Sequence, residues 1–426
     1  MTAIVAVLNK HAVAVAADSA ATISSSSNQK VFNTANKVFT LSKYRPVSVA
    51  IHNNSELIGV PWEIVIKEYR RHLGEKSFPT LKEYVGDFFN FLSAKSYFTK
   101  PEVHRQHLLR LMTSFLGDLI YGIRGNNLAF VGAPLSSGLS DSLKKAIQDT
   151  ATFPCVPTFA DITKDGFENE LKNEIDSIEK DLANGLQVTI DRKLLVQALF
   201  QVFTRGFSQQ AFSGVVITGY GDDEIFPSLY SYNVQHVIDN KLAIKEDKTT
   251  TVTVNDDIFI VPFAQADVMA TLIDGIAPVV KDIYFSGLTD PIKKLLKDIE
   301  NQVRPVNNKL ANNIEVFINK GLEKYIDSYI SRCDQQRKES YTDPLIRSVA
   351  MLEKEDLADF AESLISITSV KRKINLNEQN TVGGPIDVLV MSKGNGAIWM
   401  KRKHYFDPNL NPNFFNTYLK HYFYGY

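Results

Sequence analysis

The sequence has little cysteine, no long hydrophobic run and no excess of charge of one sign. Only Cys155 and Cys333 occur among 426 residues, and their spacing gives neither a disulfide framework nor a cysteine-based metal motif. No stretch reaches the roughly 18 apolar residues that a membrane-spanning helix needs. The formal net charge is −1, so the basic excess typical of nucleic-acid binding is absent. We therefore expect no nucleic-acid partner, no membrane contact, no metal and no cofactor.

The amino terminus also lacks a basic region followed by a long apolar run and a cleavage site, which argues against a signal peptide. Hydrophobic residues make up 44% of the chain, an ordinary fraction for a globular protein with a substantial core. We expect a soluble, cytoplasmic protein. Because 426 residues exceed the usual length of one domain, we expect two domains or one domain with large insertions.

Two short apolar runs flank the polar residues Asn9, Lys10 and His11 near the amino terminus. Runs of this length, rich in Val, Ile and Ala, are typical of buried strands joined in a hairpin. A two-residue turn makes the numbers of paired residues sum to 19, and a three-residue turn makes them sum to 20. Either register brings the carboxylate of Asp18 beside Thr2.

Thr2 has the chemistry of a nucleophile if the mature chain begins with it. The hydroxyl group attacks, and the free α-amine, whose ordinary pKa is about 7.7–8.0, accepts the proton near neutral pH. A threonine in mid-chain has only an amide nitrogen at that place and carries no base. Removal of Met1 is therefore the expected activating step, and no further propeptide is needed. Many intracellular proteins also begin Met-Thr and continue into a hairpin, so this motif alone is not specific.

Lys37 opens a short strand in KVFTLSKYRPVSVAIHNN, and a further apolar strand follows at residues 47–51. With these segments the chain resembles the proteasome β-subunit family and its bacterial relatives among the amino-terminal nucleophile (Ntn) hydrolases. In this resemblance Thr2 matches the family's nucleophile, Asp18 its aspartate and Lys37 its catalytic lysine. Ser19, next to Asp18, is a supporting candidate. The resemblance also implies that Asn53 lies at a turn from strand to helix and offers a backbone N–H to the oxyanion.

Two later blocks carry the same resemblance. The segment FSGVVITGYGDDEIFPSLY, residues 212–230, is similar to the family's central hairpin. The segment NEQNTVGGPIDV, residues 377–388, is similar to its Asp-x-x-Ser-Gly-Gly loop, with Gly383 and Gly384 in the glycine positions. Gly383 is therefore a supporting candidate.

The chain departs from the family pattern at three positions, two of them in the second of these blocks. The family's loop aspartate falls on Gln379 and its loop serine on Val382, while Glu378 lies one place away and substitutes if the loop shifts. Glu378 and Gln379 are therefore supporting candidates only. A second serine, which helps to orient the terminal amine in the family, falls on Ala264. A methyl group cannot form a hydrogen bond, so the amine loses one orienting partner.

The resemblance implies an α+β fold: a four-layer α-β-β-α Ntn-hydrolase sandwich with helical insertions, in which two antiparallel sheets face each other. A helix is expected over Ser55–Leu73, after the strand at residues 47–51. The expected segments are an Ntn core in three parts at 1–74, 208–289 and 341–403, mostly helical insertions at 75–207 and 290–340, and an aromatic tail at 404–426.

Other candidate sites have plainer interpretations. His104 and His107 lie one helical turn apart, but no third ligand accompanies them, so we interpret them as a solvated or capping pair. The acidic run at 222–224 is interpreted as a solvated turn.

These features predict hydrolysis of peptide or amide bonds through an acyl-enzyme on Thr2, with a peptide or protein as substrate. The charge of Lys37 lowers the proton affinity of the hydroxyl and the amine, and Asp18 holds Lys37 charged and aimed. Two alternatives stay open. The missing serines favour a catalytically weak or inactive structural or regulatory subunit, whereas the intact set of three opposes it. A small-molecule amidase of the same fold is the other alternative.

We also expect a homo-oligomer, either a closed six- or seven-fold ring or a dimer or open assembly. The near-zero net charge gives little repulsion between copies. The aromatic tail at 404–426 is a candidate contact.

Overall fold

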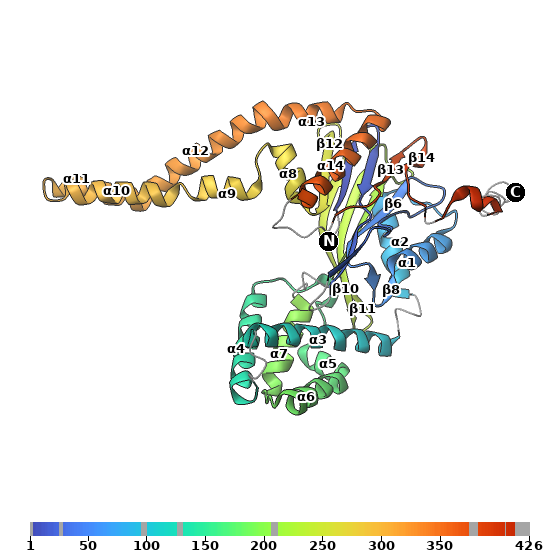
Figure 1. Ribbon diagram of the computed structural model, residues 1–426, viewed down its shortest axis with the longest axis horizontal. Helices are drawn as coiled ribbons and strands as arrows, with labels where there is room; N and C mark the ends of the chain where they lie inside the picture. The colour runs from blue at the N-terminus through green and yellow to red at the C-terminus, as the bar shows by residue number, and fades with distance from the viewer. Residues whose placement is uncertain are drawn as a thin grey trace.

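The computed structural model describes residues 3–24, 29–94, 100–125, 131–205, 212–374, 382–404 and 406–413. These residues form two five-stranded antiparallel sheets, two short strand pairs and many helices (Figure 1). The predicted mixed α+β class is confirmed. No helix in these ranges is both long and apolar enough to cross a membrane.

The first sheet has the amino-terminal hairpin near its centre. Its strands lie in the order β12 (Ile258–Ala264), β1 (Ala3–Asn9), β2 (Val13–Ala17), β13 (Asp387–Ser392) and β14 (Gly396–Lys401). Every residue of β1 and β2 is buried. A strand covered on both faces needs apolar residues at successive positions, which explains the unbroken Ala and Val runs.

The second sheet packs against the first. Its strands lie in the order β11 (Lys241–Thr251), β10 (Ser228–Ile238), β9 (Ser213–Gly219), β6 (Val47–Asn53) and β5 (Val38–Thr40). One hydrophobic cluster contains Ile4 and Val15 of the first sheet together with Val216 and Leu229 of the second. The two sheets therefore share a core face to face. A small separate pair joins β3 (Ala21–Ser24) to β4 (Gln29–Phe32).

Helices cover the outer faces of both sheets. They are α8 (Ala266–Asp274), α13 (Asp343–Ala350) and α14 (Lys354–Ile374) on the first sheet, and α1 (Trp62–Leu73) and α2 (Leu81–Ala94) on the second. Val5 and Leu364 belong to a hydrophobic cluster between the first sheet and its helices. Tyr69 and Phe88 belong to another cluster between the second sheet and its helices. Helix α2 falls inside the predicted insertion at 75–207, yet it packs with α1 on the sheet.

The helix predicted for Ser55–Leu73 begins only at Trp62, so that prediction is wrong over residues 55–61. Instead, β7 (Glu56–Leu57) and β8 (Val60–Pro61) form a short hairpin, with positive φ at Ile58 (51°) and Gly59 (79°) in its turn. Proline has no N–H for a helix interior, so the helix starts directly after Pro61.

Helices α3–α7 pack around a hydrophobic cluster of their own. They are α3 (Pro101–Arg124), α4 (Ala133–Ala151), α5 (Lys164–Glu170), α6 (Lys172–Leu186) and α7 (Arg192–Arg205). Leu139 and Phe167 are fully buried in this cluster. Ile238 of β10 and Ala243 of β11 also belong to this cluster, so the helices pack against the end of the second sheet where β10 and β11 meet. In Figure 1 they lie below the sheets.

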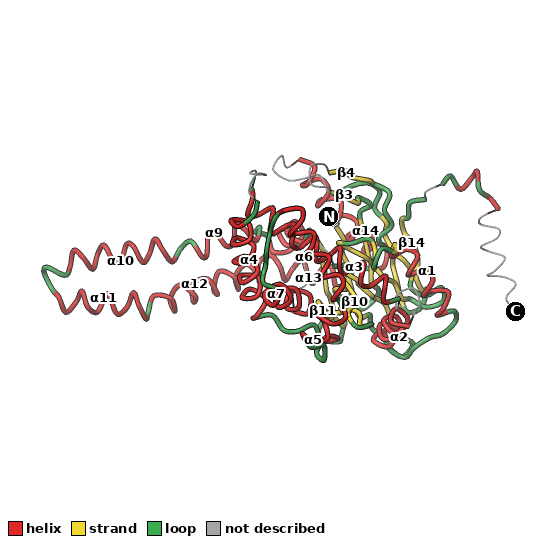
Figure 2. The backbone as a smooth tube through the Cα atoms, turned by 90° about the horizontal axis from the view of Figure 1, so that it is seen from below, coloured by secondary structure: helices red, strands yellow, loops and turns green. Residues whose placement is uncertain are grey.

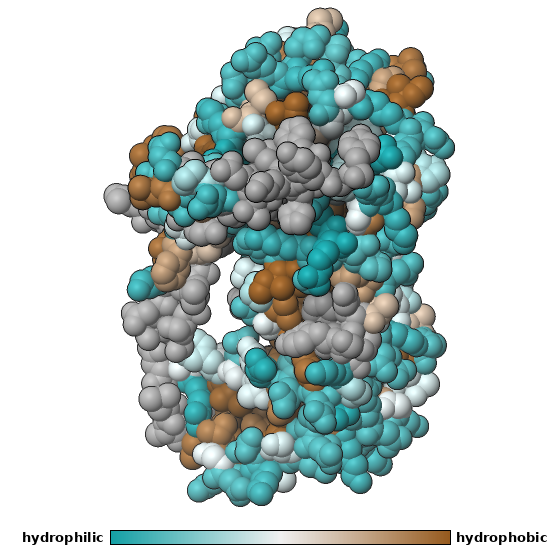
Figure 3. Space-filling model, turned by 90° about the vertical axis from the view of Figure 1, so that its right-hand side faces the viewer, coloured by the Kyte–Doolittle hydropathy of each residue, from teal (hydrophilic) through white to brown (hydrophobic). Residues whose placement is uncertain are grey.

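Helices α9–α12 form an arm that projects from the body (Figures 1 and 2). They are α9 (Pro278–Ser286), α10 (Thr289–Val303), α11 (Asn308–Lys320) and α12 (Leu322–Arg337). Lys281 of α9 forms an ion pair with Asp334 of α12 at 3.0 Å, so the two limbs lie side by side at the base. The predicted helical insertion at 290–340 supplies most of this arm. On the face shown in Figure 3, hydrophilic residues predominate among the residues that are coloured by hydropathy.

Candidate active site

The amino-terminal hairpin has a longer turn than predicted. Paired residue numbers of β1 and β2 sum to 21, as in Ile4 with Ala17 and Leu8 with Val13, so both predicted registers are wrong. The side chain of Asn9 explains the difference, because its Oδ1 accepts hydrogen bonds from the backbone N–H groups of His11 (3.0 Å) and Ala12 (3.1 Å). An Asn that bonds its own backbone in this way stabilises a wider turn.

This register places Asp18 opposite Ala3, the residue that follows Thr2 in the sequence. The backbone N–H of Asp18 donates to the carbonyl of Ala3 at 3.2 Å, and the N–H of Ala3 donates to Oδ1 of Asp18 at 2.9 Å. The predicted proximity of the carboxylate to the start of the chain therefore holds for Ala3. Thr2 itself lies outside the described residues.

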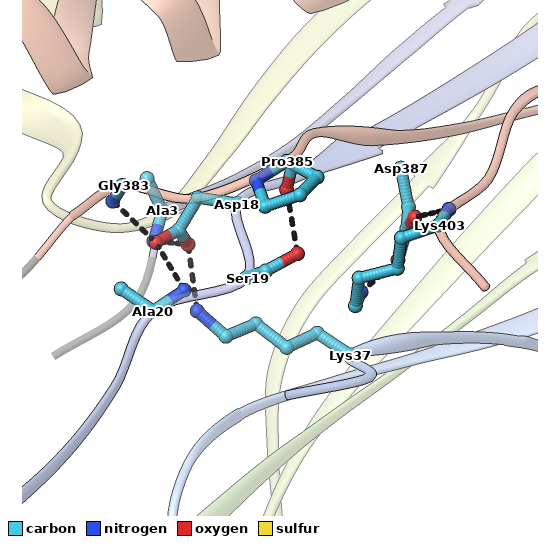
Figure 4. Close-up of polar contacts among 9 residues, drawn as sticks. All are labelled: Ala3, Asp18, Ser19, Ala20, Lys37, Gly383, Pro385, Asp387 and Lys403. Carbon is cyan, nitrogen blue, oxygen red and sulfur yellow. Dashed lines mark hydrogen bonds and ion pairs between the residues drawn. The ribbon is translucent and has the colours of Figure 1, made fainter. Parts of the chain in front are cut away.

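The Asp18 carboxylate is buried and accepts four hydrogen bonds (Figure 4). Oδ1 accepts from the Ala3 N–H and from the ammonium Nζ of Lys37 at 2.6 Å. Oδ2 accepts from the N–H groups of Ala20 and Gly383, each at 3.1 Å. An ionised carboxylate offers about four acceptor positions, so this one is fully satisfied in its charged form.

Lys37 reaches Asp18 from the second sheet. Its carbonyl accepts a hydrogen bond from the N–H of Ile51 at 2.8 Å, which extends the β5–β6 pairing by one residue. The side chain is only 6% exposed. Burial lowers the pKa of Lys37, and the Asp18 carboxylate opposes this shift in part. A lysine with a lowered pKa and a fixed partner is suited to electrostatic or proton-transfer work.

Ser19 fastens the loop after residue 382 to the same place. Its hydroxyl donates to the carbonyl of Pro385 at 2.5 Å, and its N–H donates to the carbonyl of Gly383 at 3.1 Å. Two of the four supporting candidates, Ser19 and Gly383, therefore lie at the Asp18–Lys37 ion pair. The other two, Glu378 and Gln379, lie outside the described residues.

Two further candidate positions lie at strand ends. Asn53 ends β6 with a φ of 68°, and its side-chain amide donates to the carbonyl of Phe212 at 2.9 Å. Its role as an oxyanion donor stays a prediction. Ala264, at the end of β12, is the partner of Ala3 in the sheet and has a φ of 55°. The methyl group predicted to replace an orienting hydroxyl therefore stands across the strand from Ala3.

Sequence reasoning missed an adjacent ion pair between Asp387 and Lys403. Both side chains are largely buried, and Asp387 lies opposite Ala17 in the first sheet. The only signal was an aspartate that starts an apolar strand, and nothing in the sequence pairs it with Lys403. The histidine interpretation also needs correction, because His104 is 2% exposed and so is not solvated. No metal-binding group of three or more His, Cys, Asp or Glu occurs among the residues that the structure describes.

Comparison with known proteins identifies no family for this chain. No family model matches it, and no curated protein matches it. Among solved structures, Anbu (ancestral beta-subunit) from Yersinia bercovieri is similar over 99% of this chain and 96% of that chain, at 9% identity and a TM-score of 0.25.

These values correct the proteasome β-subunit-like assignment made from the sequence. A TM-score of 0.25 at 9% identity is too low to support it, and short blocks with Thr, Asp, Lys and paired Gly recur by chance.

Proposed function

We propose that the protein hydrolyses peptide or amide bonds, with Thr2 as an amino-terminal nucleophile. The supporting observation is the buried ion pair between Asp18 and Lys37. Asp18 also accepts a hydrogen bond from the N–H of Ala3, which belongs to the peptide bond that follows Thr2. The carboxylate and the ammonium therefore lie beside the backbone at the point where a terminal threonine would react. The proposal requires a mature chain that begins at Thr2.

The proposed reaction has two halves. The free amine of Thr2 takes the hydroxyl proton while Oγ attacks the substrate carbonyl carbon. The tetrahedral intermediate then collapses, the leaving amine takes up that proton, and an ester remains on Thr2. The same amine then takes a proton from a water molecule, whose oxygen attacks the ester carbonyl carbon. As the bond to Oγ breaks, this proton passes to Oγ and the acid is released. The Lys37 ammonium stabilises the negative charge that develops at Oγ, and Asp18 fixes its position.

We further infer that the two sheets and their helices stack as the four α-β-β-α layers expected for an Ntn hydrolase. The three clusters that join helix to sheet, sheet to sheet and sheet to helix support this arrangement. It places β1, which leads directly from Thr2, and the β5–β6 hairpin, which carries Lys37, on facing sheets. Such an arrangement explains why the ion pair crosses between the sheets.

A labelling experiment tests the nucleophile. Intact mass first establishes whether Met1 is absent from the purified protein. Wild type, Thr2→Ser and Thr2→Ala are then treated with a peptide β-lactone, which acylates a terminal hydroxyl, and assayed on fluorogenic peptide amides. We expect labelling and turnover in the first two and neither in Thr2→Ala. Full activity of Met1-free Thr2→Ala would show that the nucleophile is elsewhere.

A second set of variants tests the charge. Lys37→Ala removes a positioned cation, for which a rate loss of at least about 100-fold is expected. Lys37→Arg should restore only part of the rate, because guanidinium is larger and planar. Lys67→Ala is the matched control, since Lys67 is exposed and pairs with Glu63 on α1. Lys37→Ala within a few-fold of wild type would leave Lys37 a structural lysine.

Two alternatives give different results in these experiments. A structural or regulatory subunit would keep Met1 or show no labelling at Thr2. A small-molecule amidase would be labelled at Thr2 but would turn over short acyl amides rather than peptides. Homo-oligomerisation stays a proposal as well, supported by the exposed apolar side chains of the arm described below.

A further inference from the structure

A second buried ion pair lies beside the first. Asp387 is the first residue of β13, and its register partner Ala17 precedes Asp18. Lys403 bonds Asp387 twice: its N–H donates to Oδ1 at 2.8 Å, and its ammonium donates to Oδ2. The exposed fractions of the two side chains are 11% for Lys403 and 5% for Asp387.

A buried ion pair is weak evidence for a purely stabilising role. Desolvation of two charges often offsets their attraction, so an apolar pair of similar volume would serve stability as well. What the pair does fix is geometry. It joins the start of β13 to the segment that leaves β14, through two directional hydrogen bonds.

The segment that ends at Asp387 is anchored at alternate residues. The N–H of Gly383 donates to Asp18, the carbonyl of Pro385 accepts from Ser19, and the carboxylate of Asp387 accepts from Lys403. In Figure 4 the Ser19–Pro385 hydrogen bond lies between the two ion pairs. Displacement of Asp387 would therefore pull on the residues that hold Asp18.

We propose that Asp387 and Lys403 are positioning residues of the candidate active site: their ion pair holds residues 383–387 against Asp18 and Ser19, and their charges contribute to the field at Lys37. The inference deepens the proposed hydrolase function and rests on it. Neither residue touches the reacting atoms.

The charges that act on Lys37 come from three elements. Asp18 follows β2, Asp387 begins β13 and Lys403 follows β14. Asp18 and Asp387 raise the pKa of Lys37, and Lys403 lowers it, although burial has the largest effect. Removal of the Lys403 charge should therefore raise the pKa of Lys37, and removal of the Asp387 charge should lower it.

The test is a titration of Lys37 by NMR in protein labelled with ¹³C at the lysine ε-carbon, with the Lys37 signal assigned by its loss in Lys37→Met. Lys403→Met should raise the pKa of Lys37, Asp387→Asn should lower it, and the double variant should return towards wild type. Lys401→Met is the matched control, because it removes one charge from the same hairpin at an exposed pair with Glu362.

Amide exchange at Gly383 gives a second readout, and it should become faster in both single variants. Unchanged Lys37 titration together with unchanged Gly383 exchange would overturn the proposal. Shifts of the same sign in both single variants would show general loosening rather than a positioned field, and would overturn it as well.

Kinetics then separate this inference from the proposed function. In active protein, both single variants should lose about 10-fold or more in kcat, because small misplacements of a catalytic group cost that much, and the pH–rate profile should move with the Lys37 titration. If wild type shows no Thr2-dependent hydrolysis, the proposed function fails while the NMR result still decides the positioning of Lys37. If hydrolysis depends on Thr2 but neither variant moves the profile or the titration, only this inference fails.

Discussion

The two helical additions to the sheets differ in how they bury apolar surface. Helices α3–α7 close around a continuous cluster that also takes in the ends of β10 and β11. The arm, α9–α12, buries far less apolar surface than α3–α7. Of the arm residues whose burial is described, the buried ones are Glu300, Ala311, Ile318, Leu322 and Ile326. Similar helical sequence patterns can therefore produce a packed unit or a projecting hairpin, depending on whether the helices find a common core.

The arm compensates in part with charge. Arg304, at the turn between α10 and α11, bonds Glu300 and also pairs with Glu315 at 2.9 Å. This network fastens the tip, but it leaves a series of apolar side chains in solvent. Those more than half exposed include Ile283, Tyr284, Leu295, Val316, Tyr325 and Tyr329. Exposed apolar groups in this number mark a surface that gains from being covered.

The largest expected difference comes from the same substitution in each region. Leu139→Ala in α4 should destabilise the α3–α7 region by about 3–5 kcal/mol, because its neighbours are packed on every side. Leu322→Ala in the arm should cost about 2 kcal/mol or less, because exposed helices can relax around the deletion. Hydrogen exchange measured by mass spectrometry on peptides from each region gives both values. Equal costs would mean that the arm is as tightly packed as α3–α7.

A smaller, pH-dependent effect should come from the packed region. His236 of β10 lies between Phe159 and Phe203 and donates from Nε2 to the carbonyl of Phe203 at 2.9 Å. Burial lowers the pKa of His236 to about 3, with a smaller contribution from His107. The unfolded chain takes up a proton near pH 6.5, whereas the folded chain does not. Stability should therefore fall by up to about 1.4 kcal/mol per unit as pH drops below 6.5 towards the folded pKa.

Urea denaturation followed by circular dichroism at pH 7 and pH 5 measures this effect. His236→Gln should flatten the pH dependence. Burial also lowers the pKa values of His107 and of His52 in β6 to about 4 each, so a residual slope in His236→Gln is expected. A pH dependence that His236→Gln leaves intact would place its source elsewhere.

The smallest effect on stability should follow removal of the arm. Lys281 and Asp334 form an ion pair, so a short Gly/Ser linker can replace residues 282–333 without moving the base. We expect the stability of the sheets to change by less than about 1 kcal/mol, because the removed residues add little to their core. Light scattering after size exclusion should show loss of the homo-oligomer. A full-length protein that is already monomeric at micromolar concentration would contradict the proposed assembly.

A chain ending at Lys403 separates the arm from the tail. Most of the aromatic tail predicted as a contact lies outside the described residues, so only this comparison addresses it. Loss of the oligomer on truncation at Lys403, with the arm intact, would assign the contact to the tail.

The part of the site that could be predicted is the part fixed by local pattern. The unbroken apolar runs predicted the hairpin and placed Asp18 near the start of the chain. The contact between Asp18 and Lys37 was expected only from the resemblance to the proteasome β-subunit family, because no local pattern joins the two residues. The turn length could not be predicted, because it depends on which backbone groups the side chain of Asn9 accepts from. The burial of His104 depends on neighbouring helices that share no sequence signal with it.

The four hydrogen bonds that Asp18 accepts also say when this site can first exist. Three donors, Ala3, Ala20 and Lys37, are synthesised early, but the fourth, Gly383, comes from the last part of the chain. At ordinary rates of translation, on the order of tens of seconds separate Lys37 from Gly383. During that interval β13, the neighbour of β2 in the first sheet, is also missing. A nascent chain on the ribosome, or one cut short before residue 383, therefore carries the early residues of the site without the contact that completes the carboxylate's environment.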